Sequence, residues 1–394
     1  MKYSLIDFKQ QIKTEKARIL QFWAEKSPDQ INGGFIGKMN FDGTVCPGAE
    51  KGGVLNARIL WTFSAAFNAG SGESLETAHR AYHYINQQFR DTVYGGVYWS
   101  VDAQGKPLST RKQIYGLAFT MYGLAEYYRA TNHPEALDFA NELFELIEKH
   151  SFDAQNGGYW EAFTQDWQLL EDLRLSEKDR NDPKTMNTHL HLIEAYVNLY
   201  RVRPNERVEA RIRHLLEVFE QYIIDAQTDH MKLFFDARWN PQSTAVSFGH
   251  DIEASWLLYE ATEVLQDEKL LKKWRHIALR MADAAAEGFN EDGSLNHEFD
   301  PAAHHWDTHR EWWVTAEGMV GYINAFQLSG DERYLRYVER LWKFAKIYLI
   351  NAEAGEWNWG VYDDMSPMLT EDRIGFWKCP YHNARACMEI LKRI

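Results

Sequence analysis

The stretch VYGGVYW (93–99) indicates the fold, because similar stretches recur at a regular interval along the chain. Two of them, INGGF (31–35) and QNGGYW (155–160), also contain a pair of glycines followed by aromatic residues. Both steps of the repeat are 62 residues long when measured between the second glycines, which are Gly34, Gly96 and Gly158. A fixed internal period is the signature of a fold assembled from copies of one supersecondary unit.

Three later segments continue the repeat with fewer glycines. They are HMKLFFD (230–236), DGSLNHEFD (292–300) and GEWNWGVYD (355–363). If Leu233, Leu295 and Trp357 are equivalent, the interval is again 62 residues. The step between the two groups is longer, and the charged insert at 171–184 accounts for the difference. We therefore expect six short turns or hairpins.

Helical patterns alternate with these segments. Stretches such as 118–131 and 135–150 place apolar residues at i, i+3, i+4 and i+7, which predicts amphipathic helices. The twelve expected helices lie near residues 4–26, 55–69, 74–90, 112–131, 135–150, 186–202, 205–225, 248–266, 268–287, 311–328, 332–349 and 379–393. Long glycine-containing connections alternate with short turns, so every second helix begins at the same end of the molecule.

Six such helix pairs can close into a ring. We expect an all-α fold, an (α/α)6 barrel with short β-hairpins in the long connections at one rim, formed by a single domain over residues 1–394. An open solenoid of helical hairpins is the alternative arrangement. Neither architecture implies a function by itself.

Composition excludes several classes of partner. A net charge of −14 disfavours nucleic acid and anionic membranes, both of which would repel such a surface. The three cysteines form no CxxC pair, and the N-terminal segment is a polar amphipathic helix without the apolar core of a signal peptide. We expect a cytoplasmic protein that is a monomer or a weak homodimer. Its 15 tryptophans offer many flat rings for stacking.

Polar and aromatic residues gather at the start of every second helix. If these helices line the barrel, their first turns project into one end of one cavity. The residues concerned are Arg58, Tyr115, Asn187, His191, His250, Glu253, Trp312, Trp313, Glu317 and His382. His189 points away from His191 on the same helix and is expected in the core. Trp312 and Trp313 are adjacent, so we expect one to face the cavity and the other to pack outward.

Three functions compete for these residues. The three histidines and Glu253 could bind a metal, although HExxH and CxxC patterns are absent. A glycosidase would need paired carboxylates, for which Glu253, Glu317 and Asp307 are available. A lectin would need only the aromatic and polar lining. The residues alone leave all three open.

Five motifs then identify a family. They are LNARILW (55–61), MNTHLHLIEAY (186–196), FGHDIEASWLL (248–258), EWWVTAEG (311–318) and WKCPYHN (377–383). In order and spacing the chain resembles the N-acylglucosamine 2-epimerase superfamily, most closely its cellobiose 2-epimerase branch. The resemblance spans nearly the whole chain and implies an (α/α)6 barrel.

The resemblance also implies an activity and roles for residues. It implies reversible epimerisation at C2 of the reducing-end sugar of β-1,4-linked disaccharides, with a small-molecule substrate and no metal or nucleotide cofactor. His250 and His382 would be the acid/base pair, and His191 would assist ring opening. Reducing-end binding or histidine orientation is implied for Arg58, Tyr115, Asn187 and Glu253. Stacking on the sugars is implied for Trp313 and Trp377, with Glu317 alongside and Asp179 near the second sugar.

The chemistry of C2 epimerisation requires such groups. The C2 hydrogen is acidic only in the open-chain aldehyde, and its removal leaves a cis-enediolate whose charge must be stabilised. Arg58 is the natural cation for that charge. Two histidines on opposite faces can remove and return the proton near neutral pH, and we expect Glu253 to fix the tautomer of His250. A monosaccharide 2-epimerase or an aldose–ketose isomerase such as mannose isomerase remains the alternative.

Overall fold

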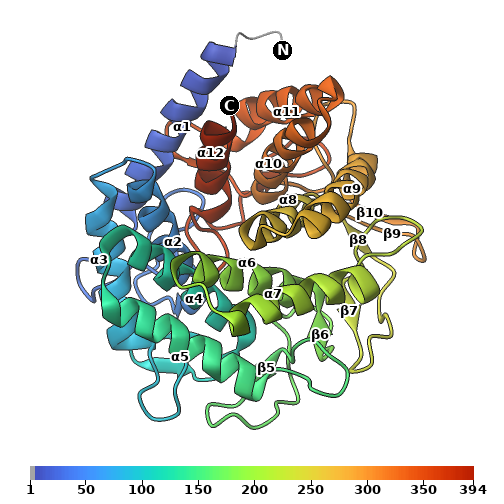
Figure 1. Ribbon diagram of the computed structural model, residues 1–394. Helices are drawn as coiled ribbons and strands as arrows, with labels where there is room; N and C mark the ends of the chain where they lie inside the picture. The colour runs from blue at the N-terminus through green and yellow to red at the C-terminus, as the bar shows by residue number, and fades with distance from the viewer. Residues whose placement is uncertain (1–4) are drawn as a thin grey trace.

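Two concentric rings of helices make up the computed structural model, which describes residues 5–394 (Figure 1). The inner helices are α2 (Gly53–Asn68), α4 (Ile114–Thr131), α6 (Met186–Val202), α8 (Phe248–Leu265), α10 (Trp312–Ser329) and α12 (Tyr381–Arg393). The outer helices are α1 (Leu5–Lys26), α3 (Ser74–Tyr84), α5 (Pro134–His150), α7 (Glu206–Val218), α9 (Glu268–Ala285) and α11 (Glu332–Phe344). Residue 4, which the sequence also assigned to the first helix, lies outside the described residues.

The ring closes through its first and last members. Each inner helix packs against the next one in the chain, and α12 also contacts α2. Five helix pairs are consecutive in sequence, whereas the sixth joins α12 to α1, so the two ends of the chain complete one unit. The predicted (α/α)6 barrel is confirmed, and the open solenoid is excluded by the contact between α12 and α2.

Burial separates the two rings. In the inner helix α2 every residue from Gly53 to Ser64 is buried, as expected for a helix that is apolar nearly all round. The outer helix α9 buries one stripe only: Trp274, Ile277, Ala278, Met281, Ala282, Ala284 and Ala285. Three outer helices end in a π-helical turn, and α9 ends in a 3₁₀ turn. These turns are η1 (Ile85–Phe89), η2 (Phe219–Ile223), η4 (Ala345–Leu349) and the 3₁₀ turn η3 (Ala286–Gly288).

A hairpin follows each outer helix, as the repeat predicts. Antiparallel bridges join Pro28 to Phe35, Arg90 to Val97, Phe152 to Tyr159, Ile224 to Met231, Phe289 to Leu295 and Ile350 to Trp357. In the first three hairpins an aspartate accepts hydrogen bonds from the backbone two and three residues further on, and both glycines have positive φ. The equivalence assumed for Leu233 was wrong, because Met231 occupies the position that Leu295 and Trp357 occupy in the next units.

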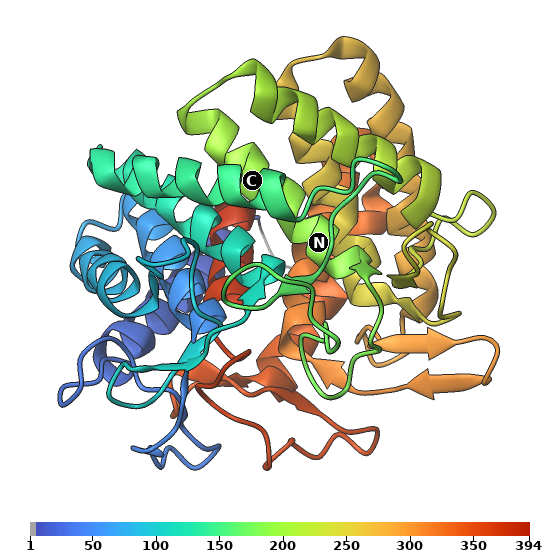
Figure 2. The same cartoon turned by 90° about the horizontal axis from the view of Figure 1, so that it is seen from below.

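Short strands bind the long connections to the inner helices. The strands are β1 (Lys51–Gly52), β2 (Ser100–Val101), β3 (Pro107–Ser109), β4 (Lys112–Gln113), β5 (Ala162–Phe163), β6 (Lys184–Thr185), β7 (Phe234–Phe235), β8 (Val246–Ser247), β9 (Glu298–Asp300), β10 (His305–Asp307), β11 (Arg310–Glu311), β12 (Ile350–Asn351), β13 (Glu356–Trp357) and β14 (Gly360–Val361). The two residues before five of the inner helices pair antiparallel with the following connection, in β1–β2, β4–β5, β6–β7, β8–β9 and β11–β14. The connections therefore gather on one side, below the helices in Figure 2, with the inner helix N-termini.

Buried ion pairs hold this rim together. Before three inner helices, a buried lysine binds the aspartate of the preceding hairpin: Lys51 to Asp29 at 2.7 Å, Lys112 to Asp91 at 2.6 Å and Lys184 to Asp153 at 2.8 Å. Lys378 binds Glu356 at 3.0 Å before α12. A buried ammonium group is tolerated only when it is paired, so these contacts fix where four of the inner helices begin.

Two further sequence expectations can be compared with the structure. All three cysteines are free thiols: Cys46, Cys379 and Cys387. Among the described residues, none of the helices has both the length and the apolarity needed to cross a bilayer.

Candidate active site

An open cavity of about 510 Å3 lies at the rim where the inner helices begin. This volume suits a small organic ligand. Every predicted site residue except Glu317 lines it: Arg58, Tyr115, Asp179, Asn187, His191, His250, Glu253, Trp313, Trp377 and His382. The convergence predicted from the helix starts is therefore confirmed. A second hollow, of about 680 Å3, lies at the other end of the barrel, among the C-terminal halves of the inner helices.

Three histidines in the cavity wall use the same ring nitrogen to contact the protein. Nδ1 of His191 lies 3.0 Å from Glu194, and Nδ1 of His382 lies 2.7 Å from Glu317. Because a carboxylate only accepts hydrogen bonds, it selects the tautomer with the proton on Nδ1. Nε2 of both rings is then an unprotonated nitrogen available to a ligand.

His250 has a different partner. Its Nδ1 lies 2.9 Å from the hydroxyl of Ser247, the residue immediately before α8. A hydroxyl can donate or accept, so Ser247 permits either neutral tautomer and also the charged ring. The protonation state of His250 is thus less constrained than that of His382.

The cavity keeps these imidazoles neutral. Burial lowers the pKa of His250 well below its usual value, and the neighbouring His191 lowers it further. Burial, followed by the charges of Arg58 and Arg385, does the same to His382. Burial also lowers the pKa of His191, despite Glu194. All three rings are therefore free bases near neutral pH.

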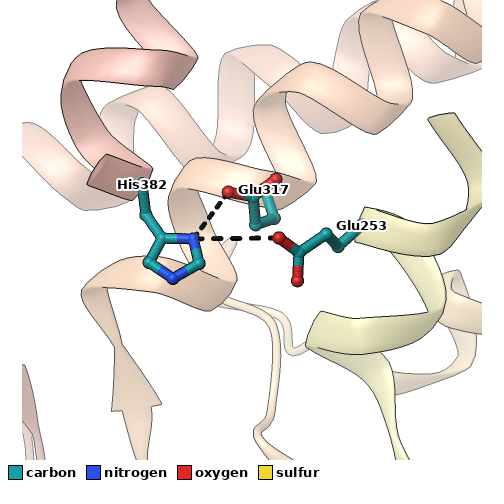
Figure 3. Close-up of side chains that lie close together, drawn as sticks. All are labelled: Glu253, Glu317 and His382. Carbon is teal, nitrogen blue, oxygen red and sulfur yellow. Dashed lines mark hydrogen bonds and ion pairs between the residues drawn. The ribbon is translucent and has the colours of Figure 1, made fainter. Parts of the chain in front are cut away.

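The position of Glu253 corrects a sequence expectation. Glu253 does not orient His250; its Oε1 lies 2.6 Å from Nη2 of Arg385. The same oxygen lies 4.0 Å from Nδ1 of His382 (Figure 3). Spacing within one helix predicts which residues share a face, but it does not show which side chains a neighbouring helix brings to that face. Here α12 brings Arg385, whose guanidinium binds this carboxylate more strongly than a neutral imidazole would. Burial, followed by the charge of Glu317, raises the pKa of Glu253 to about 8.

Glu317 also occupies a different place from the one expected. It is fully buried behind His382 and accepts hydrogen bonds from that ring, from Arg385 at 2.7 Å and from Trp256 at 3.2 Å. Figure 3 shows Glu317 and Glu253 approaching the same edge of the imidazole from two different helices. From this position Glu317 can orient His382 but cannot contact a sugar in the cavity.

Arg58 is a buried cation without an acidic partner. Its Nη2 donates to the hydroxyl of Tyr115 at 2.8 Å, and its Nε has no hydrogen-bond partner among the described residues. Aromatic rings enclose the guanidinium, with the Phe119 centroid 4.2 Å and the Tyr381 centroid 4.8 Å from Cζ. No carboxylate of residues 5–394 lies within salt-bridge distance of it. Its positive charge is thus available to an anion in the cavity.

Tryptophans form one wall. The Trp313 ring lies 4.7 Å from the ring of His250 and 5.8 Å from that of His382, so both histidines border the same aromatic surface. Trp312 also lines the cavity and packs against Trp359 at 4.5 Å. The expectation that one of the adjacent tryptophans packs outward is wrong, because both lie in the first turn of α10, beside the open rim. Trp377 lies 6.0 Å from Tyr115.

The insert contributes a further wall. Residues Leu175–Asp179 line the cavity, and Asp179 accepts hydrogen bonds from the backbone and hydroxyl of Ser176, both at 2.9 Å. Asn187 lies nearby, and its buried Oδ1 has no partner among the described residues. An unsatisfied buried acceptor in a cavity wall is a contact point for a hydroxyl-bearing ligand.

Sequence reasoning missed several residues of the site. Arg385 and Glu194 lie three positions after His382 and His191, which is the same spacing that singled out Glu253 after His250. His297 also lines the cavity; although burial opposes its charge, Glu311 and Asp307 raise its pKa to about 9. Glu311 and Trp359 lie in stretches quoted above but were not recognised as lining residues, and neither were Glu371, Asp372 and Phe376. His189, by contrast, lies in the core as expected, between Thr185 and Tyr159.

The metal and glycosidase alternatives depend on free carboxylates. Glu253, Glu317 and His382 are close enough together to bind an ion. Nη2 of Arg385 nevertheless lies 2.6 Å from Glu253 and 2.7 Å from Glu317, so a guanidinium already satisfies both. An acid that attacks or protonates a glycosidic bond must face the sugar, whereas Glu317 lies behind His382. The donor set therefore fits neither alternative well.

Known proteins resemble the chain over its whole length. A family model for N-acylglucosamine 2-epimerase (GlcNAc 2-epimerase) matches residues 34–386. A cellobiose 2-epimerase of Bacteroides fragilis is 47% identical over 97% of this chain and 98% of its own length. The structure of cellobiose 2-epimerase from Bacillus thermoamylovorans is 39% identical, with a TM-score of 0.94 over 99% of this chain and 100% of that chain. A D-mannose isomerase of 21% identity shares the fold, with a TM-score of 0.87 over 100% of both chains. The chain belongs to the N-acylglucosamine 2-epimerase family of carbohydrate epimerases.

Proposed function

We propose that the protein reversibly epimerises C2 of the reducing-end sugar of β-1,4-linked disaccharides, converting cellobiose to glucosyl-mannose and lactose to epilactose. The observation that carries the proposal is the placement of His250 and His382, two neutral imidazoles on different helices, against one tryptophan ring in one cavity. The names of relatives at 47% and 42% identity support the disaccharide as substrate.

The reaction begins with ring opening. A proton must reach the ring oxygen while the C1 hydroxyl loses one, because only the open-chain aldehyde acidifies the C2 hydrogen. Solvent in the open cavity supplies the proton that the ring oxygen gains, and ring closure returns it. His191 assists at this stage, because its Nδ1 is held by Glu194 and its Nε2 can accept a hydrogen bond from a substrate hydroxyl. The proton that leaves the C1 hydroxyl charges His250, whose Ser247 partner accommodates the charged ring.

Inversion at C2 then uses His382 as the base and the charged His250 as the acid. In the direction in which His382 is the base, its Nε2 removes the C2 proton and the electron pair forms the cis-enediolate. Glu317 supports the imidazolium that results, as the carboxylate does in a hydrolase triad. Charged His250 returns a proton to C2 from the opposite face. In the reverse direction the two histidines exchange these roles.

Arg58 balances the charge of the intermediate. The enediolate is an anion, and a cation that the protein holds in a fixed position stabilises the developing charge without having to reorganise as water does. Arg58 has no competing carboxylate, and Tyr115 holds its guanidinium in place. The N-termini of the inner helices add positive potential at the same rim.

The remaining lining residues suit a substrate of two sugars. Trp313 and Trp377 offer ring surfaces for sugar faces, and Asn187 offers an unsatisfied acceptor for a hydroxyl group. The insert places Asp179 at the cavity, where it can bind the non-reducing sugar. A monosaccharide would leave this part of the cavity empty.

One NMR experiment tests the proposal. The protein is incubated in heavy water with cellobiose, lactose, mannobiose, mannose and N-acetylglucosamine in separate samples. We expect the disaccharides to give C2 epimers that carry deuterium at C2. Ketose as the main product from mannose would favour the isomerase alternative, free glucose would favour a glycosidase, and unchanged sugars would contradict the proposal.

A further inference from the structure

Arg385 lies behind the cavity and holds three carboxylates at once. Its Nη1 binds Glu194, and its Nη2 binds Glu253 at 2.6 Å and Glu317 at 2.7 Å. The guanidinium also donates to the hydroxyl of Tyr381 and lies 4.1 Å from the centre of that ring. It is almost fully buried and is not part of the cavity wall. A substrate in the cavity therefore does not touch it.

The three carboxylates come from three different helices and serve two different histidines. Glu194 of α6 holds His191, and Glu317 of α10 holds His382, whereas Glu253 of α8 lies 4.0 Å from Nδ1 of His382. We call Glu194, Glu253 and Glu317 the carboxylate cluster. Three buried negative charges repel one another and would take up protons from water at neutral pH without a cation among them.

We propose that Arg385 is the positioning residue that keeps Glu194 and Glu317 ionised, and through these two carboxylates sets both His191 and His382 with Nε2 as the free base. The inference rests on the proposed epimerisation and adds a residue to it. A cluster that gained a proton could donate it to Nδ1 of His382, which would place the imidazole proton on Nε2. That tautomer cannot remove a proton from C2.

The pKa directions agree with this geometry. Burial opposes the ionisation of Glu194, yet the charge of Arg385 brings its pKa below the usual value. The pKa of Glu253 is raised to about 8 by burial and by Glu317, even with Arg385 in place. Glu253 is thus the member of the cluster that carries a proton near neutral pH, and the single guanidinium leaves the negative charge on the carboxylates that hold the two histidines.

The test replaces the guanidinium and follows activity against pH. For Arg385→Met we expect kcat at pH 7 to fall roughly 100-fold or more, with KM little changed because Arg385 does not line the cavity. The acid limb of the kcat profile should move to higher pH, since raising the pH removes the extra proton from the cluster. Arg385→Lys keeps one charge and should shift the limb less.

Arg201→Met is the matched control. Arg201 is a half-buried arginine that binds Glu260 at 2.8 Å beside the hollow at the other end of the barrel, and neither residue lines the cavity that contains the histidines. It should lower the unfolding temperature without moving the pH profile. If Arg385→Met loses activity in equal proportion at every pH, as a merely structural residue would, the inference is wrong.

A double variant gives an independent readout. Glu253→Gln removes the carboxyl group that carries the proton of the cluster, so in the Arg385→Met background it should leave Glu317 ionised and restore activity by about tenfold, a coupling of the size found for contacting residues. Further loss in the double variant would overturn the inference. Wild-type protein with cellobiose in heavy water is the reference for all variants: absence of C2 exchange there contradicts the proposed function itself, whereas active wild type with an unshifted Arg385→Met profile contradicts only the role of Arg385.

Discussion

Two buried arginines near the same cavity have opposite surroundings. Arg58 faces the cavity among aromatic rings, with a tyrosine hydroxyl as its closest hydrogen-bond partner. Arg385 lies behind the wall and is shared by three glutamates. A guanidinium stays charged in both settings, so the difference lies in which anion balances it.

The comparison separates two uses of buried charge. The charge of Arg385 is balanced within the protein, and the result is a fixed arrangement of carboxylates and imidazoles. The charge of Arg58 is left unbalanced, which is costly in the empty protein and favourable once a negative charge develops in the cavity. His382 is linked to Arg385, because Glu317 contacts both of them. Nδ1 of His250 instead contacts the hydroxyl of Ser247 and not a carboxylate.

Removal of either imidazole, that of His250 or that of His382, should have the largest effect, because these two groups transfer the proton at C2 themselves. For His250→Ala and for His382→Ala we expect kcat to fall by about 10³-fold or more, within the range for loss of a general acid or base. Steady-state assays with cellobiose measure the loss, and circular dichroism checks that the helices are retained. Substantial activity in either variant would refute the two-histidine mechanism.

Arg58→Lys should have the next largest effect. An ammonium keeps the charge but cannot reproduce the planar fork held by Tyr115, so we expect kcat to fall roughly 10²–10³-fold, as when an oxyanion donor is lost. Arg201→Lys is the control for replacing a half-buried arginine outside this cavity. Near wild-type rates for Arg58→Lys would mean that another group balances the enediolate.

Much of this site could be predicted from the sequence, because repetition carries the information. The 62-residue interval and the helix periodicity place every inner helix start at one rim, so Arg58, His191, His250 and His382 converge without any knowledge of contacts. The register failed only at Leu233, where the connection between units differs in length and no Gly-Gly pair marks the position.

The contacts between helices could not be predicted in this way. Spacing along α8 suggests that Glu253 contacts His250. Its partners in the structure come from α12, which brings Arg385 and His382 to this carboxylate. Closure of the ring of helices brings together Glu253 and Arg385, which are 132 positions apart in the chain, and no local sequence pattern predicts this contact. The expectation that one of Trp312 and Trp313 packs outward was wrong for a related reason, since a residue in the first turn borders the open rim whichever face of the helix it occupies.

Glu317→Gln and Ser247→Ala compare the partners of the two histidines directly. Glu317→Gln removes the charge that supports His382 as an imidazolium, and its amide can donate to Nδ1 and select the wrong tautomer, so we expect a loss of about 100-fold in kcat. Ser247→Ala removes a neutral hydrogen bond worth about 1 kcal/mol, which corresponds to a loss below tenfold. Equal losses would mean that the two histidines depend on their partners to the same degree.

His297→Gln should shift the pH profile by a small amount. At pH 7 His297 is charged, since its pKa is about 9. Burial and His191 have the largest effects in lowering the pKa of His250, and the charge of His297 lowers it further. Without it the pKa of His250 rises, so the acid limb of kcat/KM should move to higher pH, by less than one pH unit because burial dominates. His309→Gln, which removes another partner of Asp307 outside the cavity wall, is the control. An unchanged or downward-shifted limb would contradict this role.

Chelation should have the smallest effect, and it tests the role assigned to Arg385. The atoms of Glu253, Glu317 and His382 are grouped closely enough for a divalent ion, but the guanidinium already supplies the positive charge between the two carboxylates. A metal would have to displace it and leave Arg385 buried without its partners, at a cost of several kcal/mol. We therefore expect prolonged EDTA treatment, followed by assay with cellobiose, to leave kcat unchanged within about 10%. Inactivation that added Mn²⁺ or Zn²⁺ reverses would show that an ion, and not Arg385, balances these carboxylates.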